Sequence, residues 1–490
     1  MKRISAFPLF LFLLAFFFVL HGSMENYDFV PLKDAILLTG LYCAVSAILL
    51  FLFWLFYRDL IKAGLASFPI MAFHFFFGSV HDSLKKNFPD SFLSKYSFIL
   101  PVALILFLLV LVLIKKRKKP FGKLSFYLNT LFILLLIVDS VILLTKVIGS
   151  SHQEQASTPV GMNPCKDCPK PDIYFIIADE YVGNSTLKDK FSFDNSAFTD
   201  NLAARGFHTI PYSSSNYNFT PYSVASTLNM DYLDIRAQKK ADQSDLALCY
   251  STIQNNRFLR YLQSEGYTFR NYSIFDFDGQ PARTEVTFLP VKTKLITGQT
   301  FISRFNRDIR YHLITDLETK SEIKRMAYGF LQNNENIYNL TQKEVTTISS
   351  SPKLVLTHLH LPHYPYYFDK DGKERPLEKL TEGNQTDKAA YVQYLQYGNK
   401  KYLELIDHIL KESRTPPIII LMGDHGFRHF TEEVDLKYWY LNQLSLYTPG
   451  KNYAVYGDSL TNVNFLRVLL NVEYKQQLPL LNDRAIFIEE

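Results

Sequence analysis

The stretch at 173–180 reads Ile-Tyr-Phe-Ile-Ile-Ala-Asp-Glu, and it decides the fold class of the larger part of the chain. A continuous apolar run rich in β-branched and aromatic residues, closed by polar ones, is typical of a strand buried on both faces. Leu354 to Leu359 and Ile418 to Met422 have the same character, and helical patterns such as Lys388 to Lys411 lie between them. Strands alternating with helices predict an α/β domain with a mostly parallel sheet covered by helices on both faces.

Carboxylates and imidazoles follow these three strands. They are Asp179 and Glu180 after the first strand, His360 and His363 after the second, and Asp424 and His425 after the third. Because ligands collect at the carboxyl ends of parallel strands, we expect these side chains to meet at one edge of the sheet. Oxygen and nitrogen ligands without a neighbouring Cys suit Zn²⁺ or Mn²⁺ and argue against a structural zinc site. The sequence therefore predicts a divalent metal centre.

A hydroxyl group stands at the predicted start of another helix. Thr220 occupies an N-cap position there, and Pro221 the first helical position. Backbone N–H groups and the positive end of the helix dipole suit a bound phosphate at such a place. Taken alone, Thr220 is an ordinary capping residue. A divalent cation beside it would make the hydroxyl a usable nucleophile.

The composition excludes several classes of protein. The 490 residues contain 52 Lys and Arg against 47 Asp and Glu, a net charge of +5, which is too small over this length to indicate nucleic-acid binding. Four Cys are too few for a disulfide scaffold, and 48% hydrophobic residues exclude a disordered chain. The chain therefore folds around substantial apolar cores.

The first 150 residues are dominated by long apolar runs. A bilayer core of about 30 Å needs roughly 20 apolar residues in a helix. Five stretches predict spans: Ile4 to Leu20, Ala35 to Tyr57, Ala63 to Val80, Phe98 to Ile114, and Leu124 to Val147. The first fits an uncleaved anchor better than a signal peptide, because its apolar run is long and no small-x-small cleavage pattern follows. The third contains Pro69, His74 and Gly78, so a re-entrant or interfacial segment is its alternative.

Positive residues beside the spans predict their orientation. They lie before the first span, between the second and third, and, most densely at Lys115 to Lys123, between the fourth and fifth. Since Lys and Arg mark cytoplasmic ends, an odd number of spans places everything after Ser150 outside the cytoplasm. Asp139 within the fifth span is expected to face a neighbouring helix or polar cleft rather than lipid.

Three regions follow from this pattern: a transmembrane domain at 1–150, a linker at 151–170 and an extracytoplasmic domain at 171–490. The linker contains Cys165 and Cys168 as Cys-x-x-Cys. Outside the cytoplasm, a local disulfide is the simplest interpretation, because the surroundings lack a thioredoxin-type βαβ pattern and further zinc ligands.

The motifs, in this order, resemble the alkaline-phosphatase superfamily. Within it they are similar to the membrane-anchored sulfatase-like branch, which includes lipoteichoic acid synthases and lipid A phosphoethanolamine transferases. The resemblance covers the five spans followed by one catalytic domain and four ordered motifs between 171 and 430. Gly423-Asp424-His425-Gly426 is the most specific of these motifs.

The resemblance implies roles for individual residues. Glu180 or Asp179, together with Asp424 and His425, would bind metal, and Thr220 would be the metal-bound nucleophile. His363 matches best the histidine that contacts the transferred group. Four further residues are expected to bind substrate: His358, His360, Arg428 and His429.

The resemblance also implies an activity and a location. We expect a metal-dependent transferase of the bacterial inner membrane that moves phosphoethanolamine or phosphoglycerol from a phospholipid to a glycan or lipid acceptor. The mechanism implied is a covalent phosphothreonine intermediate. No Arg follows Thr220-Pro221-Tyr222-Ser223 as a sulfatase frame requires, which disfavours sulfate ester hydrolysis. A phosphodiesterase or phosphatase, and a non-catalytic binding protein on the same fold, remain as alternatives.

Overall fold

The computed structural model describes residues 7–25, 30, 32–88, 91–150, 159, 161–235, 239–240, 243–284, 293–306, 320–380 and 383–489. The chain divides into two compact units. A helical unit comprises Met1–Glu154 and Leu289–Thr319, and an α/β unit comprises Gln155–Phe288 and Lys320–Glu490. The described segment 293–306 thus belongs to the helical unit, although α/β-unit residues come before and after it in the sequence.

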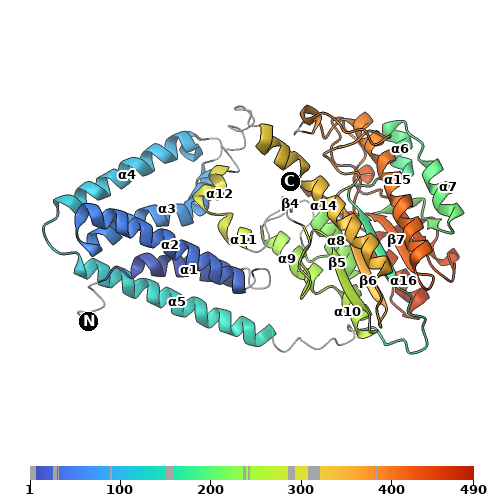
Figure 1. The fold of residues 1–490 in the computed structure, drawn as a ribbon, viewed down its shortest axis with the longest axis horizontal. Coiled ribbons are helices and arrows are strands. Elements are labelled where there is room, and N and C mark those ends of the chain that lie inside the picture. The colour runs from blue at the N-terminus through green and yellow to red at the C-terminus, as the bar shows by residue number, and fades with distance from the viewer. Residues whose placement is uncertain are drawn as a thin grey trace. The chain divides into compact units, whose positions relative to one another are not determined.

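The helical unit is built from long apolar helices (Figure 1). Its elements are α1 (Phe10–Glu25), α2 (Leu32–Tyr57), α3 (Leu60–Asn87), η1 (Phe92–Ser94), α4 (Tyr96–Lys116), α5 (Gly122–Ser150), α11 (Thr293–Thr297) and α12 (Phe301–Phe305). Among the described residues, four helices, α2 to α5, are long and apolar enough to cross a membrane. The third predicted span is therefore confirmed as one long helix, which continues through Pro69.

Helix α1 differs from the span predicted at Ile4 to Leu20. Over the described residues it has 16 residues, slightly fewer than the roughly 17 that a span requires. Phe10, Leu14 and Ala15 are completely buried, and the Phe10 amide donates a 2.6 Å hydrogen bond to Asn129 Oδ1 of α5. Helix α1 therefore packs within the bundle.

Asp139 of α5 faces a helix neighbour, as predicted. Its Oδ2 lies 3.1 Å from Nδ1 of His21 on α1, and the carboxylate is buried. On its other side, His21 Nε2 lies 3.5 Å from a carboxylate oxygen of Glu25. A buried carboxylate in an apolar bundle is costly, and the imidazole offsets part of that cost.

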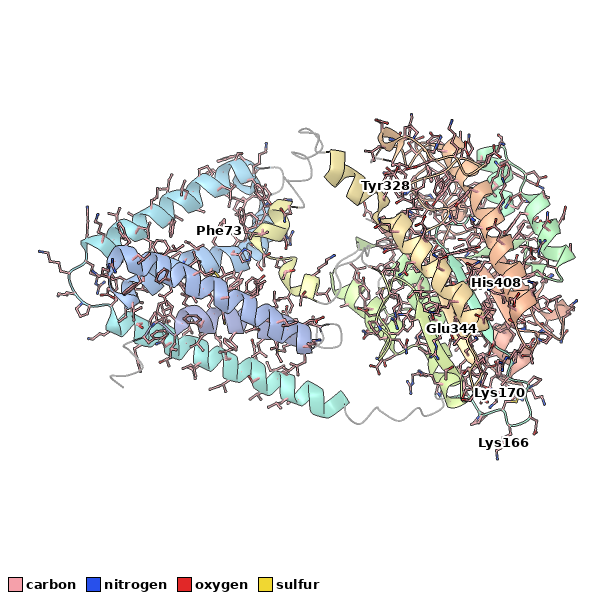
Figure 2. All side chains as sticks on the ribbon, viewed as in Figure 1. Phe73, Lys166, Lys170, Tyr328, Glu344 and His408 are labelled. Atoms are coloured by element: carbon pink, nitrogen blue, oxygen red, sulfur yellow. A yellow bond between two sulfur atoms is a disulfide. The ribbon has the colours of Figure 1, made fainter. Side chains whose placement is uncertain are left out.

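Helix α12 docks on α3, whereas α11 contacts α1 and α2. Figure 1 shows α12 beside α3, and their residues are in contact. The Gly78 amide donates a 2.8 Å hydrogen bond to Gln299 O, and Arg304 makes two hydrogen bonds to Asp82 of 3.0 and 2.5 Å. The ring of Phe301 lies 5.2 Å from that of Phe73, which Figure 2 labels.

The α/β unit contains a six-stranded sheet in the order β2-β8-β7-β1-β6-β5. Its strands are β1 (Ile173–Ala178), β2 (His208–Thr209), β5 (Thr268–Tyr272), β6 (Lys353–Leu359), β7 (Ile418–Gly423) and β8 (Leu444–Tyr447). Strands β5, β6, β1 and β7 run parallel to one another. Strand β8 is antiparallel to its two neighbours, β7 and the edge strand β2. The predicted mostly parallel sheet is confirmed, and all three predicted strands belong to its centre.

Helices cover both faces of the sheet. Tyr174 and Ile176 of β1 belong to a core that also contains the buried faces of α14 and α15, whereas Phe175 points the other way, to Phe258 of α10. Figure 2 shows Tyr328 and Glu344 along α14 and His408 on α15. The helices are α6 (Asn184–Phe191), α7 (Ser196–Ala204), α8 (Thr220–Asn229), α9 (Gln243–Gln254), α10 (Arg257–Ser264), α14 (Lys320–Thr346), α15 (Lys388–Glu412) and α16 (Asn462–Glu473).

Smaller elements complete the unit. In the described part of the chain, two short strand pairs lie apart from the main sheet: β3 (Tyr212–Ser214) with β9 (Ser459–Thr461), and β4 (Lys239–Lys240) with β10 (Ile488–Glu489). The described short 3₁₀ helices of this unit are η3 (Leu377–Lys379), η4 (Leu436–Trp439) and η5 (Ala454–Tyr456). Cys165 and Cys168 form the predicted disulfide. Next to it, Lys170 Nζ lies 3.0 Å from a carboxylate oxygen of Glu265, which attaches the disulfide segment to the end of α10.

Candidate active site and metal centre

Three neighbouring strands end level with one another. Ala178 of β1 is in register with Leu359 of β6 and with Gly423 of β7. The next residues are Asp179, His360 and Asp424, so the register brings these side chains to one edge of the sheet.

The turn after β1 directs its two acidic residues differently. Glu180 has a φ of 58°, a left-handed conformation that is uncommon for a residue with a side chain. Its amide donates a 2.9 Å hydrogen bond to Asp424 Oδ1, and the His425 amide donates one of 3.0 Å to the same oxygen. The turn is thereby joined to the segment after β7.

Thr220 meets that segment from a different element. Helix α8 begins at Thr220 itself, with Phe219 as its N-cap residue, so the helix starts one residue earlier than predicted. Thr220 Oγ1 lies 3.1 Å from His425 Nε2, and the side chain is 7% exposed. Ser223, one turn along α8, donates a hydrogen bond from its hydroxyl to the carbonyl of Asp424 and holds the helix in place.

The His425 ring has a defined orientation. Its Nδ1 lies 2.7 Å from the Gly426 carbonyl, so we assign the ring proton to Nδ1. That leaves the lone pair of Nε2 facing Thr220 Oγ1, Asp424 Oδ2 at 3.5 Å and Asp179 Oδ1 at 3.9 Å. A backbone carbonyl that fixes the tautomer in this way is usual for a metal-binding histidine.

The donor set of Asp179, Asp424 and His425 fits a divalent cation. One donor atom from each lies within 4.8 Å of the others, and all three side chains are buried. Asp179 Oδ1 and Asp424 Oδ2 are buried without a hydrogen-bond partner among the described residues. Buried carboxylate oxygens are normally paired or bound to a metal, so this geometry has the chemistry of a cation site.

The pKa values of the three carboxylates of this site are shifted in different directions. Burial, followed by the charge of Asp179, raises the pKa of Asp424. Burial also raises the pKa of Glu180 well above its usual value. Burial alone would do the same for Asp179, but His363 and the neighbouring His358 and His360 hold its pKa well below the usual value. A bound cation would offset the repulsion between the buried carboxylates.

Histidines form the other side of the site. His360 Nε2 lies 2.7 Å from the Tyr364 carbonyl and its Nδ1 lies 3.3 Å from Asp179 Oδ2. His363 Nδ1 approaches the same carbonyl at 2.6 Å, and the two rings lie 4.1 Å apart. Burial and the neighbouring His360 lower the pKa of His363 well below its usual value.

Two more groups of donor atoms could hold a cation. Asp179, His360 and His363 form one, and Glu180, His363 and His429 form the other, each with its atoms within 4.8 Å. His429 Nε2 lies 3.8 Å from Glu180 Oε1, which also accepts a 2.9 Å hydrogen bond from the Arg428 amide. Glu180 therefore faces the histidines, whereas Asp179 lies between them and the group around His425.

The remaining predicted substrate-binding residues lie at different depths. His358 is 1% exposed, with Nε2 3.5 Å from Asp179 Oδ2, a position suited to orienting that carboxylate. Arg428 is half-buried, and its guanidinium lies 4.5 Å from the centre of the Phe219 ring, next to Thr220 in the chain. Among these residues, Arg428 and His429 are the more exposed, as contact with a substrate requires.

Two supporting residues are absent from the sequence-based prediction. Tyr391 of α15 donates a 2.7 Å hydrogen bond from its hydroxyl to the Glu180 carbonyl. Asn334 of α14 accepts from the His360 amide and donates to the His360 carbonyl, both at 2.8 Å. In the sequence, Tyr391 belongs to an ordinary apolar helix face, and nothing marks Asn334.

Comparisons with known proteins give structural likeness at low identity. No protein-family model and no curated protein sequence matches the chain. Similar solved structures include the C-terminal periplasmic domain of EcEptC from Escherichia coli in complex with Zn, with 12% identity and a TM-score of 0.40 over 68% of this chain and 94% of that one.

Two further structures extend this likeness. The lipooligosaccharide phosphoethanolamine transferase A (EptA) from Neisseria meningitidis shares 13% identity, with a TM-score of 0.35 over 96% of this chain and 95% of that one. A protein of the alkaline phosphatase superfamily from Vibrio parahaemolyticus shares 13% identity, with a TM-score of 0.35 over 64% and 70%. These solved structures come from the groups of proteins that the sequence motifs resemble.

Proposed function

We propose that this protein is a metal-dependent transferase that moves a phosphorylated headgroup, phosphoethanolamine or phosphoglycerol, from a membrane phospholipid to a glycan or lipid acceptor. The observation that carries the proposal is the 3.1 Å contact between Thr220 Oγ1 and His425 Nε2, beside two buried carboxylates with unpartnered oxygens. A hydroxyl at a helix start next to a cation site is a suitable nucleophile for phosphoryl transfer.

Asp179, Asp424 and His425 would hold the cation, either Zn²⁺ or Mn²⁺, with Thr220 beside it and Glu180 facing the histidines. Such an ion lowers the pKa of a neighbouring hydroxyl and neutralises charge on a phosphodiester. This ligand set of carboxylate oxygens and an imidazole nitrogen is compatible with both metals.

The chemistry of the chain's own residues proceeds in two halves. Thr220 Oγ1 attacks phosphorus, a bond from that oxygen to phosphorus forms, and the bond from phosphorus to the diacylglycerol oxygen breaks. We assign to His363 the proton that Thr220 loses and the leaving oxygen gains. In the second half, an acceptor hydroxyl attacks the phosphothreonine diester: a bond from its oxygen to phosphorus forms, the bond from phosphorus to Thr220 Oγ1 breaks, and the proton of the acceptor passes through His363 to Thr220 Oγ1. Arg428, whose guanidinium lies over the ring of Phe219 next to Thr220, would contact the phosphate oxygens.

The helical unit suits a lipid donor. Withdrawing a lipid from the bilayer costs about 0.8 kcal/mol per CH₂ group, so an enzyme for phospholipid headgroups must work at the membrane surface. Four helices with the length and composition of membrane spans meet this need. We place the α/β unit outside the cytoplasm at the bacterial inner membrane, following the positions of the positive residues.

Mass spectrometry of the peptide containing Thr220 tests the proposal. The full chain is incubated with vesicles of phosphatidylethanolamine and phosphatidylglycerol, and the mass added to the peptide identifies the headgroup. Thr220→Ala should abolish both the adduct and turnover. Thr227→Ala is the matched control, because Thr227 is a buried hydroxyl on the same helix that makes no hydrogen bond with the described residues. Full turnover by Thr220→Ala would remove Thr220 from the mechanism.

A further inference from the structure

A separate cavity of about 360 Å³ lies beside the turn that follows Glu180. Its walls come from the start of α6, from α7, from the segment 209–212 and from Asn442 and Gln443, which precede β8. None of the catalytic or metal-binding candidates lines it. The volume falls within the range of roughly 300–1,000 Å³ that small-molecule sites occupy.

The cavity wall combines apolar surface with polar side chains and carries little net charge. Its polar side chains include Asn184, Ser185, Thr209 and Gln443, and Lys188 is the only cation in the wall. Lys188 Nζ lies 3.2 Å from Asp194 Oδ2, so its charge is largely compensated. Amide and hydroxyl side chains both donate and accept hydrogen bonds, as the hydroxyl groups of a sugar do. This chemistry fits a neutral polyhydroxylated ligand better than a phosphate or a carboxylate.

One buried hydroxyl in the wall lacks an internal partner. The Oγ of Ser185 is shielded from solvent and has no hydrogen-bond partner among the described residues. Thr209 by contrast is bonded to Ser445, with 2.6 Å between their hydroxyl oxygens. Since the one oxygen is shielded and the other is bonded, the hydroxyl groups of a ligand meet the more exposed polar side chains of the wall, Asn184, Thr199 and Tyr212.

An aromatic ring stands at the cavity. Tyr212 is 57% exposed, and among the described residues of the α/β unit it is the only aromatic one of the exposed large apolar side chains. An exposed apolar ring beside a polar cavity indicates a binding surface. A tyrosine ring offers a flat apolar face for the C–H face of a pyranose and a hydroxyl for hydrogen bonding.

The cavity wall is hydrogen-bonded to the metal-binding turns. Asn442 donates from its side chain to the carbonyl of Gly423, the residue before Asp424. The Gln443 amide donates a 2.9 Å hydrogen bond to the carbonyl of Tyr181, the residue after Glu180. A ligand held here lies against the segments that position the candidate nucleophile and cation.

We propose that this cavity binds a neutral sugar unit of the acceptor, so that the acceptor is a glycan or a glycolipid with an uncharged sugar. This inference rests on the proposed transferase function and specifies its acceptor. Tyr212 stacks on the sugar ring, and the half-buried Asn184 and Thr199 bond its hydroxyl groups.

The test measures binding of maltose, cellobiose, lactose and chitobiose to the full chain in detergent micelles, by saturation-transfer NMR and titration, without phospholipid. We expect at least one disaccharide to bind in the millimolar range, and Tyr212→Ala to weaken that binding roughly tenfold. Tyr212→Phe should keep most of the affinity because it keeps the ring. Leu480→Ala, which removes an apolar side chain with the same exposed fraction of 57%, should have no effect.

Two results overturn the inference: no disaccharide binds the wild-type chain, or Tyr212→Ala binds as tightly as wild type. The Thr220 adduct is measured separately, with phospholipid and without sugar, so the two proposals can fail independently. Sugar binding that depends on Tyr212 without any Thr220 adduct would refute the transferase and leave the sugar site. An adduct without sugar binding would refute the sugar site alone.

Discussion

The hydroxyl of Tyr391 fastens the backbone of Glu180 to helix α15. It donates a 2.7 Å hydrogen bond to the Glu180 carbonyl, and the Val182 amide lies 3.3 Å from the same hydroxyl oxygen. Glu180 adopts a left-handed conformation that costs energy for a residue with a side chain. Tyr391 therefore holds in place the turn from which both Asp179 and Glu180 project.

We predict that Tyr391→Phe lowers metal affinity and turnover by about tenfold, because residues that orient metal ligands typically contribute 10–100-fold. The buried Glu180 carbonyl also loses a donor, at a cost of about 1–3 kcal/mol in the free energy of unfolding. Metal affinity is measured by titration of the metal-free protein. Tyr394→Phe, a buried tyrosine three residues along the same helix, is the control. A change in thermal stability without a change in metal affinity would show that Tyr391 stabilises the fold but does not orient the metal ligands.

The sequence predicts the parts of this site that depend on local pattern. Asp179, His360 and Asp424 come together because each follows a buried strand, and parallel strands end at the same edge. Thr220 is recognisable from the Pro221 that follows it. The start of α8 is displaced by one residue, which is a normal uncertainty of helix boundaries.

The supporting contacts could not be predicted in this way. Tyr391 reaches Glu180 across 211 residues of sequence, and its position is set by how α15 packs on the sheet. Asn334 reaches His360 from α14, which is amphipathic like any surface helix. The contact of the segment 293–306 with the helical unit also lacks a local signal, because the docking residues Gln299 and Arg304 are ordinary polar residues in sequence.

Asp424→Asn should change stability in opposite directions with and without metal. In the metal-free protein at pH 7, the substitution removes one of two buried like charges, so we expect the free energy of unfolding to rise by about 1–2 kcal/mol. Asn keeps the Oδ1 that accepts from the Glu180 and His425 amides. The metal-loaded protein should be less stable than wild type, and its transfer activity should be lost.

Denaturant unfolding with and without Zn²⁺ measures both effects of Asp424→Asn. Asp458→Asn, an exposed position, should leave both curves unchanged. A metal-free Asp424→Asn protein less stable than metal-free wild type would contradict the idea that the two carboxylates repel each other.

Removal of the metal by a chelator should abolish the proposed transfer activity and lower the midpoint of thermal unfolding. A cation that binds only the folded protein stabilises it by mass action, so its removal should lower the midpoint by several degrees. Adding back Zn²⁺ or Mn²⁺ should restore both properties, whereas Mg²⁺, which prefers an all-oxygen octahedral site, should not. Metal content is followed by elemental analysis. Full activity in a preparation shown to be free of metal would refute the metal assignment.

The Arg304–Asp82 pair should anchor the segment 293–306 to α3. Arg304 is 6% exposed and bonds the Gly298 carbonyl and Gln299 Oε1 as well as Asp82. Arg304→Ala should destabilise the docked segment by about 1–3 kcal/mol, and limited proteolysis of the detergent-solubilised protein should then cleave within it several-fold faster.

The charge exchange Arg304→Asp with Asp82→Arg should recover part of the protection, and Lys85→Ala, an exposed change on α3, should have no effect. Equal cleavage rates in wild type and Arg304→Ala would show that the apolar contacts of Phe301 with Phe73 and Phe77 hold the segment without the ion pair.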